Sequence, residues 1–254
     1  MAKAILYDAT LCVGCLECEG ACAKQNGLPY DETLAKEKRQ FEKKLTYVAV
    51  RDDEKYMRRL CMHCEDPTCA SVCPVKALEK SPWGAVTYDA SKCMGCRYCM
   101  VACPFDVPKY EWSKAIPTIR KCTMCPDRTS AGQPTACSEA CPTGATITGD
   151  RDELLREARR RILENPTQYV DHIYGEKEVG GTSVLMLSSV PFSEFGFKGF
   201  GPEPLPALTG RVLSHVPDVV TVGWALLGGV YWITTRRDAV ASIEKNGQNK
   251  EDQS

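Results

Sequence analysis

The sequence lacks an excess of charge of either sign, and this excludes one large class of functions. Lysine and arginine number 32, aspartate and glutamate number 33, and the formal net charge is -1. A nucleic-acid-binding protein would carry a clear basic excess. Disorder is excluded too, because 43% of the 254 residues are hydrophobic and 26% are charged, as in folded proteins. The length fits one large domain or two small ones.

Clear signs of a self-contained enzyme are also missing. There is no phosphate-binding loop, and the Gly199–Gly201 stretch is too short to indicate a nucleotide site. Only three histidines occur, and His63, His172 and His215 are scattered along the chain. An enzyme stays open as an alternative class, but it would need an acid, a base or a cofactor that no motif here supplies.

Cysteine, in contrast, is abundant: the chain has 16, and they divide into four complete quartets with none left over. The first and third quartets have the spacing C-x2-C-x2-C-x3-C, the second has C-x2-C-x4-C-x3-C, and the fourth has C-x2-C-x11-C-x3-C. In chain order the quartets are Cys12, Cys15, Cys18, Cys22; Cys61, Cys64, Cys69, Cys73; Cys93, Cys96, Cys99, Cys103; and Cys122, Cys125, Cys137, Cys141.

This spacing favours iron–sulfur clusters. The compact run followed by proline is the bacterial ferredoxin arrangement, and proline follows three of the quartets, whereas Ala23 follows the first. Three closely spaced thiolates can bind three irons of one cubane, but a single zinc needs four donors that converge on one ion. Disulfide partners two residues apart seldom meet the required geometry. We therefore predict [4Fe–4S] clusters, with a zinc-binding structural module as the remote alternative.

An internal repeat supports this prediction. Residues 7–18 (YDATLCVGCLEC) and 88–99 (YDASKCMGCRYC) match at Tyr, Asp, Ala, a hydroxyl residue and three Cys, and residues 73–78 (CPVKAL) echo 141–146 (CPTGAT). A short apolar run suited to a strand precedes each longer copy, at 4–6 and 85–86. Gly14 and Gly95 stand inside the cysteine loops, where we expect positive φ and backbone N–H groups directed at sulfur. The repeats predict ferredoxin half-units that pair into two two-cluster modules.

Between the first two quartets, residues 31–44 are rich in charge and predict a solvated face, and residues 45–50 predict a strand. After the fourth quartet, Asp150 and Glu153 have the spacing of a helix capping box. The helix that follows should end at Asn165-Pro166 and bury an apolar stripe on one side. Its arginines either cover the solvent side or pair with acidic clusters or a partner. The stripe is Leu154, Leu155, Ala158 and Ile162, and the arginines are Arg151, Arg156, Arg159, Arg160 and Arg161.

Residues 180–208 begin with an apolar run at 184–187 and continue as a segment rich in Gly, Pro and Phe. So many prolines exclude a regular helix. Two alternatives stay open: the segment wraps over the chain's own core, or it is an extended arm that docks on another subunit. The four phenylalanines concerned are Phe192, Phe195, Phe197 and Phe200.

Near the C-terminus, Val219–Thr235 is 17 residues long without a charge, carries Trp224, Tyr231 and Trp232, and precedes an Arg236-Arg237 pair. This pattern predicts a single membrane-spanning helix with an aromatic belt, and a buried core helix is the alternative. If the arginine pair lies inside the cell, the cysteine-rich part lies outside. The N-terminus runs directly into the first strand and loop, so we expect no signal peptide and export together with a partner that has one.

At the quartets the chain resembles the four-cluster, ferredoxin-like iron–sulfur subunits of membrane-bound respiratory oxidoreductases, over roughly residues 3–190. Residues 61–78, 93–110 and 174–191 are most similar to the electron-transfer subunit of uptake nickel–iron hydrogenases, and next to the beta subunit of respiratory formate dehydrogenases. The resemblance implies an α+β fold of two bacterial-ferredoxin-like modules with a C-terminal extended arm and a single transmembrane helix. The expected boundaries are 1–149 for the four-cluster domain, 150–211 for the helix and arm, 212–237 for the anchor and 238–254 for a polar tail.

The resemblance also implies four [4Fe–4S] clusters with crossed ligation, in which three cysteines of a quartet share a cluster with the last cysteine of another. The implied sets are Cys12, Cys15, Cys18 with Cys141; Cys122, Cys125, Cys137 with Cys22; Cys61, Cys64, Cys69 with Cys103; and Cys93, Cys96, Cys99 with Cys73. Bases such as Lys92, Arg97 and Lys121 are candidates for tuning cluster potentials, and His63 is expected to be a hydrogen-bond donor near a cluster, not a ligand.

The implied function is electron relay without catalysis. Electrons would pass between a catalytic subunit and an integral membrane subunit, either quinone-reactive or a cytochrome. The catalytic partner would be a hydrogenase, or alternatively a molybdenum or tungsten enzyme such as a formate dehydrogenase. The implied location is the cytoplasmic membrane, with the cluster domain on the periplasmic side and no nucleic-acid partner.

Overall fold

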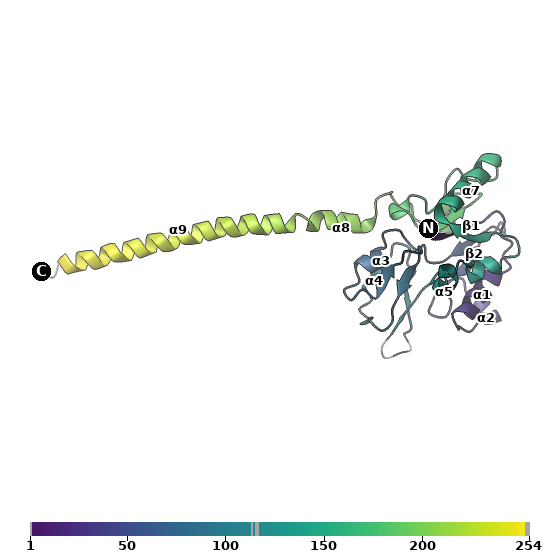
Figure 1. Cartoon of the computed structure of the whole chain (residues 1–254), viewed down its shortest axis with the longest axis horizontal. Coiled ribbons are helices and arrows are strands. Elements are labelled where there is room, and N and C mark those ends of the chain that lie inside the picture. Colours follow the sequence, from purple (N-terminus) through teal and green to yellow (C-terminus); the bar gives the residue numbers. More distant parts are fainter. Residues whose placement is uncertain (1, 113, 115–116, 252–254) are drawn as a thin grey trace. The chain divides into compact units, whose positions relative to one another are not determined.

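The computed structural model describes residues 2–112, 114 and 117–251 (Figure 1). The chain forms two compact units, Met1–Pro206 and Ala207–Ser254, which are described separately.

Short strands and helices alternate in the N-terminal unit, in agreement with the α+β prediction. The strands are β1 (Lys3–Asp8), β2 (Tyr47–Val50), β3 (Tyr56–Arg59), β4 (Leu78–Lys80), β5 (Val86–Tyr88), β6 (Lys109–Tyr110), β7 (Ile119–Arg120), β8 (Thr146–Asp150) and β9 (Val184–Leu187). The helices are α1 (Glu17–Gln25), α2 (Glu32–Lys36), α3 (Thr68–Ser71), α4 (Tyr98–Ala102), α5 (Pro126–Ser130), α6 (Ala136–Glu139), α7 (Arg151–Glu164) and the 3-10 turns η1 (Glu178–Gly180) and η2 (Phe192–Phe195).

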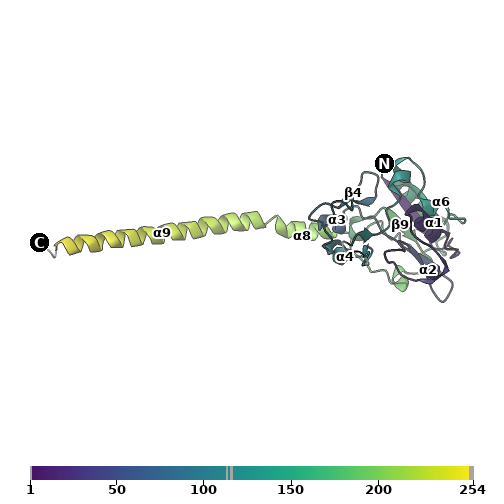
Figure 2. The ribbon, with the colours of Figure 1, turned by 90° about the horizontal axis from the view of Figure 1, so that it is seen from below.

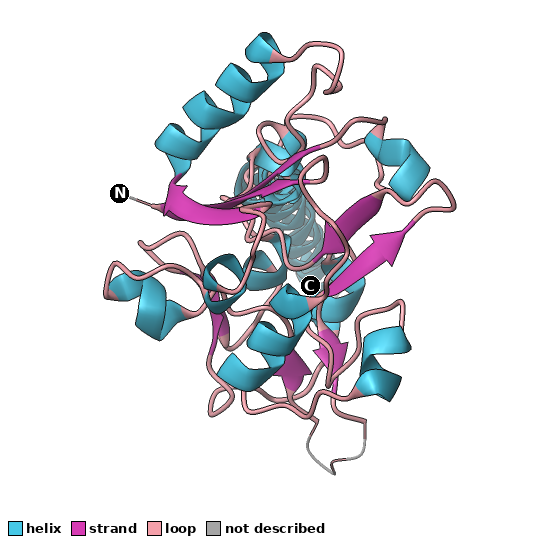
Figure 3. Ribbon diagram, turned by 90° about the vertical axis from the view of Figure 1, so that its right-hand side faces the viewer, coloured by secondary structure: helices cyan, strands magenta, loops and turns pink. Residues whose placement is uncertain are grey.

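β1 is the middle strand of a three-stranded sheet in the order β8-β1-β9, antiparallel to β8 and parallel to β9. Its apolar residues alternate between two cores because successive side chains point to opposite faces. Ala4 and Leu6 pack with α7, which lies along one side of the sheet (Figure 3). Ile5 and Tyr7 face a second core that contains cysteines. The predicted strands at 4–6, 45–50 and 85–86 are confirmed by β1, β2 and β5.

The predicted helix after residue 150 is confirmed as α7, and its apolar stripe is buried. The capping box is wrong, because among the described residues the Asp150 side chain accepts no hydrogen bond from the first turn of α7. Asp150 ends β8 opposite Lys3, and its carboxylate accepts a hydrogen bond of 2.9 Å from the Lys3 ammonium. The Asp150 carboxylate is thus engaged in a cross-strand ion pair with Lys3 and does not cap the helix.

Several arginines of α7 pair with the chain's own acidic groups. Arg160 contacts Glu157 and Glu164 on the same helix. Arg161 reaches the sheet and donates to Asp8 Oδ2 at 2.9 Å, and Asp8 is fully buried. Arg159 and Arg160 are more than half exposed and thus cover the solvent side of α7 while they pair with nearby glutamates, whereas Arg161 pairs with a buried aspartate.

The charged segment at 31–44 is mostly exposed or half-buried, as predicted, but Lys44 is an exception. Its ammonium is buried 2.7 Å from Glu19 Oε2 and donates hydrogen bonds to the carbonyl oxygens of Leu34 and Glu37. Glu19 Oε1 accepts a 2.7 Å hydrogen bond from the backbone N–H of Val48. This ion pair therefore ties α1 to the end of α2 and to β2.

Lys44→Met is expected to lower the free energy of unfolding by about 3 kcal/mol, because it leaves the Glu19 carboxylate buried without its cation. That is the low end of the range for breaking a buried ion pair, since other donors to Glu19 stay in place. Thermal unfolding of the anaerobically prepared protein measures the loss. The double variant with Glu19→Gln should recover part of it, and a loss no larger than that of the surface variant Lys36→Met would contradict the argument.

The aromatic segment after β9 wraps over the chain's own core. Phe192, Phe195 and Phe197 are buried and share a core with Tyr174, whose ring centroid lies 4.8 Å from that of Phe197. Phe200 packs edge-on against Phe105 at 5.3 Å. The wrapping alternative therefore holds for the three buried rings, and Phe200 is half-buried beside them.

The C-terminal unit is helical, with α8 (Leu205–Leu213) followed by α9 (Val216–Glu251). Pro217 stands in the first turn of α9, where its missing N–H costs nothing. Large apolar side chains such as Trp224 and Leu227 are more than two-thirds exposed. By length and composition, residues 205–243 include one helix that could cross a membrane, and none of its apolar window is buried within the structure.

Candidate metal centres

The two halves of the internal repeat are paired in the same way. β1 precedes the first quartet and pairs with β8, which follows the fourth, and Tyr7 stands opposite Thr146. β5 precedes the third quartet and pairs with β4, which follows the second, and Tyr88 stands opposite Leu78. The repeated sequence motifs thus meet in the same register, and each strand pair brings the loops of two quartets together.

The short helices that carry cysteines repeat this pairing. α1, which carries Cys18 and Cys22, packs against α6, which carries Cys137 (Figure 2). In the other half, α3 carries Cys69 and packs against α4, which carries Cys99. Helices that carry cysteines of the first and fourth quartets are thus in contact, and so are those of the second and third.

A left-handed residue stands directly before the second cysteine of every quartet. Gly14 and Gly95 have φ of 68° and 73°, as predicted. The same position has φ of 50° at His63 and 62° at Met124. Sequence reasoning missed these two because a left-handed turn is signalled by glycine and neither residue is one. Each loop reverses at this point, between two cysteines.

Two small cavities are lined by four thiols each. One, of about 20 Å³, is lined by Cys12, Cys15, Cys18 and Cys141. The other, of about 10 Å³, is lined by Cys22, Cys122, Cys125 and Cys137. Each cavity thus receives three cysteines from one quartet and the last cysteine of another.

The remaining eight cysteines form two groups by their mutual electrostatic effects. Burial raises the pKa of Cys64, and the negative charges of the nearby Cys61, Cys103 and Cys69 raise it further. Burial raises the pKa of Cys99, and a hydrogen bond from Tyr110 lowers it. Cys93, Cys96 and Cys73 raise it further, and the net shift is upward. Cys103 therefore lies near the second quartet and Cys73 near the third, although Cys69 of the second quartet is also within range of Cys99.

Burial makes several of these thiols harder to deprotonate than a free cysteine. Burial, with further contributions from neighbouring thiolates, raises the pKa of Cys18 to about 11 and that of Cys122 to about 12. Four thiolates around one cavity repel one another, and cationic iron would relieve this repulsion. Among the residues described, no three Cys, His, Asp or Glu side chains lie close enough to hold a single ion. Four cysteines line each of the two cavities, which matches the four irons of one cubane.

Polar hydrogens also point at sulfur. The backbone N–H of Ala77 donates to Cys73 Sγ at 3.2 Å, and the side-chain amide of Asn26 donates to Cys22 Sγ at 3.7 Å. Thr135 Oγ1 lies 3.3 Å from Cys137 Sγ. Hydrogen bonds to ligating sulfur raise the reduction potential of an iron–sulfur cluster.

His63 is buried and uncharged. Its Nδ1 accepts a 2.8 Å hydrogen bond from the backbone N–H of Val86, so the ring proton lies on Nε2. Burial, assisted by Lys121 and Lys80, holds the pKa of His63 well below its usual value. Nε2 has no hydrogen-bond partner within the described part of the chain. The ring is therefore a buried donor, and its role toward a cluster stays a prediction.

The three candidate tuning bases differ in position. Lys121 is buried, and its ammonium donates to the carbonyl oxygens of Val86 and Cys122. The guanidinium of Arg97 lies over the ring of Trp112 at 4.5 Å. Lys92 is half-exposed and pairs with an aspartate at 3.5 Å. Lys121 is thus the one of the three that lies among the cysteine loops in the core.

Sequence reasoning missed Arg58 on β3, outside every cysteine motif. Its side chain is fully buried and lines the cavity formed by Cys22 and the fourth quartet. Burial lowers the pKa of Arg58, but the Cys137 and Cys18 thiolates oppose this, and the net shift is upward. The signal available in the sequence was only a doubled arginine in a short strand.

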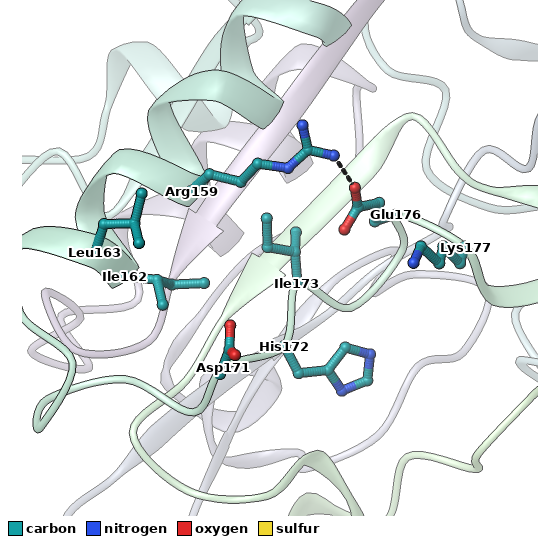
Figure 4. Close-up of a pocket in the computed structure, with 8 residues that line it drawn as sticks. All are labelled: Arg159, Ile162, Leu163, Asp171, His172, Ile173, Glu176 and Lys177. Carbon is teal, nitrogen blue, oxygen red and sulfur yellow. Dashed lines mark hydrogen bonds and ion pairs between the residues drawn. The ribbon is translucent and has the colours of Figure 1, made fainter.

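A further pocket lies between α7 and residues 171–177 (Figure 4). Arg159 and Glu176 form an ion pair across it, and no cysteine lines it. This cavity therefore has no thiol with which to hold a cluster.

Comparison with known proteins places these features in a family. The sequence profile of a 4Fe-4S dicluster domain matches residues 52–151. A protein of Nitratidesulfovibrio vulgaris is 43% identical over 95% of this chain and 69% of its own length. The hydrogenase-2 operon protein HybA of Escherichia coli is 38% identical over 74% of this chain and 70% of HybA. The iron–sulfur subunit of nitrate-inducible formate dehydrogenase from Escherichia coli is 32% identical over 71% of this chain and 66% of that subunit.

Proposed function

The chain belongs to the iron–sulfur protein family that includes HybA and the formate dehydrogenase iron–sulfur subunits, and we propose that it relays electrons through four [4Fe–4S] clusters. That it carries 4Fe–4S clusters follows from the family. When bound, such clusters supply one-electron carriers in series. The number of clusters, their ligands, their order and the partners of the chain are proposals, which the following observations support.

The proposed ligand sets are the crossed ones. Cys12, Cys15 and Cys18 would share a cluster with Cys141, and the two cavities support this set and the next. The other sets are Cys122, Cys125, Cys137 with Cys22; Cys61, Cys64, Cys69 with Cys103; and Cys93, Cys96, Cys99 with Cys73. Electrostatic grouping of the thiols supports the last two sets.

Two two-cluster modules are the organisation that the repeat favours. The first and fourth quartets would form one module around β1 and β8, and the second and third would form the other around β4 and β5. The identical register of the two strand pairs and the matched packing of α1 with α6 and of α3 with α4 support this.

The proposed order of the clusters follows from contacts between sets. Cys137 contributes to the raised pKa of Cys18 within the first module, and Cys99 contributes to that of Cys69 in the second. The modules meet where Cys61 raises the pKa of Cys122, and both residues lie in one core. The series would therefore begin with the set of Cys12, continue through those of Cys122 and Cys61, and end with the set of Cys93.

The proposed partners are a catalytic subunit and a quinone-reactive or cytochrome subunit in the membrane. The similarity to HybA favours a nickel–iron uptake hydrogenase as the catalytic partner. The similarity to iron–sulfur subunits of formate dehydrogenases supports a molybdenum or tungsten enzyme as the second candidate. We propose that the chain itself catalyses no reaction and is anchored in the cytoplasmic membrane, with its clusters on the periplasmic side. Nickel or molybdenum in the co-purifying large subunit would decide between the two catalytic partners.

The arrangement of four thiols around each of two cavities carries this proposal, and metal analysis tests it. Anaerobically prepared protein should contain about sixteen irons and as much acid-labile sulfide. Its absorbance near 400 nm should be broad and should bleach with dithionite. Zinc in place of iron, or iron and sulfide far below this content after reconstitution, would contradict it.

A further inference from the structure

Arg58 is placed against thiols of two different sets. It lines the cavity of Cys22, Cys122, Cys125 and Cys137. It also acts on the charge of Cys18, which lines the other cavity. Its Nη1 lies 3.5 Å from Thr146 Oγ1, and Thr146 lines that second cavity as well. One guanidinium therefore lines one cavity of the first module and contacts a residue that lines the other.

Only some of the hydrogen-bond donors of the Arg58 guanidinium have partners in the protein. Nε donates to Thr46 Oγ1 at 3.0 Å, but Nη2 has no hydrogen-bond partner within the described residues. The side chain is fully buried, and among the described residues no Asp or Glu forms an ion pair with it. A buried charge without a counter-charge is strongly unfavourable. The acidic groups that would compensate Arg58 are therefore the thiolates and whatever they hold.

We propose that Arg58 is a fixed positive charge shared by the two clusters of the first module, and that it raises the reduction potential of both. The inference depends on the proposed ligand sets. An oxidised cubane with four thiolates carries a formal charge of about −2, and one added electron makes it about −3. A cation buried beside the cluster favours the more negative state, and the effect is large because little water screens it.

The chain offers a matched control at the next residue. Arg59 stands on the same strand, but its guanidinium lies 3.6 Å from the ring centroid of Phe197 and donates to the Phe195 carbonyl. Burial lowers its pKa, and the groups that oppose this are Tyr47 and Tyr174, not thiols. Arg59→Met therefore removes the same charge from the same strand on the side away from the two cavities.

The test is EPR of the full-length chain in its purified complex, poised at fixed ambient potentials. In Arg58→Met the ratio of reduced to oxidised cluster should fall about tenfold for both clusters of the first module, which is about 59 mV for a one-electron couple. The other two clusters should change less than twofold, and Arg59→Met should leave the first-module ratios unchanged. Arg58→Lys keeps the charge and should retain most of the wild-type ratio.

Loss of the two clusters of the first module from Arg58→Met would remove about eight irons. In that case Arg58→Lys is the deciding variant, because a role for the positive charge requires the lysine variant to keep these irons. Unchanged ratios in a fully loaded Arg58→Met protein would overturn the inference. So would an equal shift of all four clusters, or a lysine variant as impaired as the methionine one. A wild-type protein without sixteen irons would instead refute the proposed function, so the two failures are distinguishable.

Discussion

Cys22→Ser is expected to remove one cluster and to spare its neighbour. Cys22 follows three cysteines of the first quartet in sequence, yet it lines the cavity of Cys122, Cys125 and Cys137. Serine is a much weaker ligand for iron than a thiolate. The variant should lose the cluster held by the fourth quartet, with iron falling from about sixteen to about twelve per chain.

Single-ligand variants identify the signals. Cys125→Ser should abolish the same EPR signal as Cys22→Ser, whereas Cys15→Ser and Cys141→Ser should abolish a different one. If Cys22→Ser removed the signal that Cys15→Ser removes, each quartet would hold its own cluster and the crossed ligation would be wrong. Comparing the four variants also controls for general damage, since each carries the same exchange of sulfur for oxygen.

Much of the site could be predicted because its information is local. Quartet spacing, the repeat at 7–18 and 88–99, and Gly14 and Gly95 are properties of short segments, and the structure bears out the strands and the positive φ at both glycines. The buried stripe of α7 was predictable for the same reason, since helical period alone defines a face. The pairing of distant quartets came from family resemblance, because spacing within a quartet does not identify its partner.

What could not be predicted depends on tertiary contacts. Lys44 reads as part of a solvated charged run, and only the fold brings it to Glu19. Asp150 reads as a helix cap, and only strand pairing brings it to Lys3. Arg58 lies in a strand without any motif. Its place beside the thiols is known only from the fold, in which it lines one cavity and contacts Thr146 of the other. A buried charge is invisible in sequence until its neighbours are known.

A chain that ends at Pro206 is expected to leave the membrane and to keep its clusters. All sixteen cysteines and all three hydrophobic cores lie in the Met1–Pro206 unit. The removed unit holds the one helix in the described residues that could cross a membrane. Each Leu, Ile or Val at the centre of a spanning helix favours insertion by about 0.3–0.6 kcal/mol. Iron content should stay unchanged, while the protein moves from the carbonate-washed membrane fraction to the soluble one.

Substitutions within the helix test whether its apolar character, and not merely the presence of these residues, holds the protein in the membrane. Arginine at the centre of a spanning helix costs about 2.5–3.5 kcal/mol, so Leu226→Arg with Leu227→Arg should weaken membrane retention, whereas Leu226→Ile with Leu227→Ile should not. Both leucines are about two-thirds exposed or more, so the N-terminal unit should not unfold. A truncated chain that resists carbonate would show that the N-terminal unit binds the membrane by itself. Electron transfer by the truncated protein can be measured separately. If it reduces a water-soluble dye but no longer reduces quinone, the helix holds the last cluster near its acceptor in the membrane.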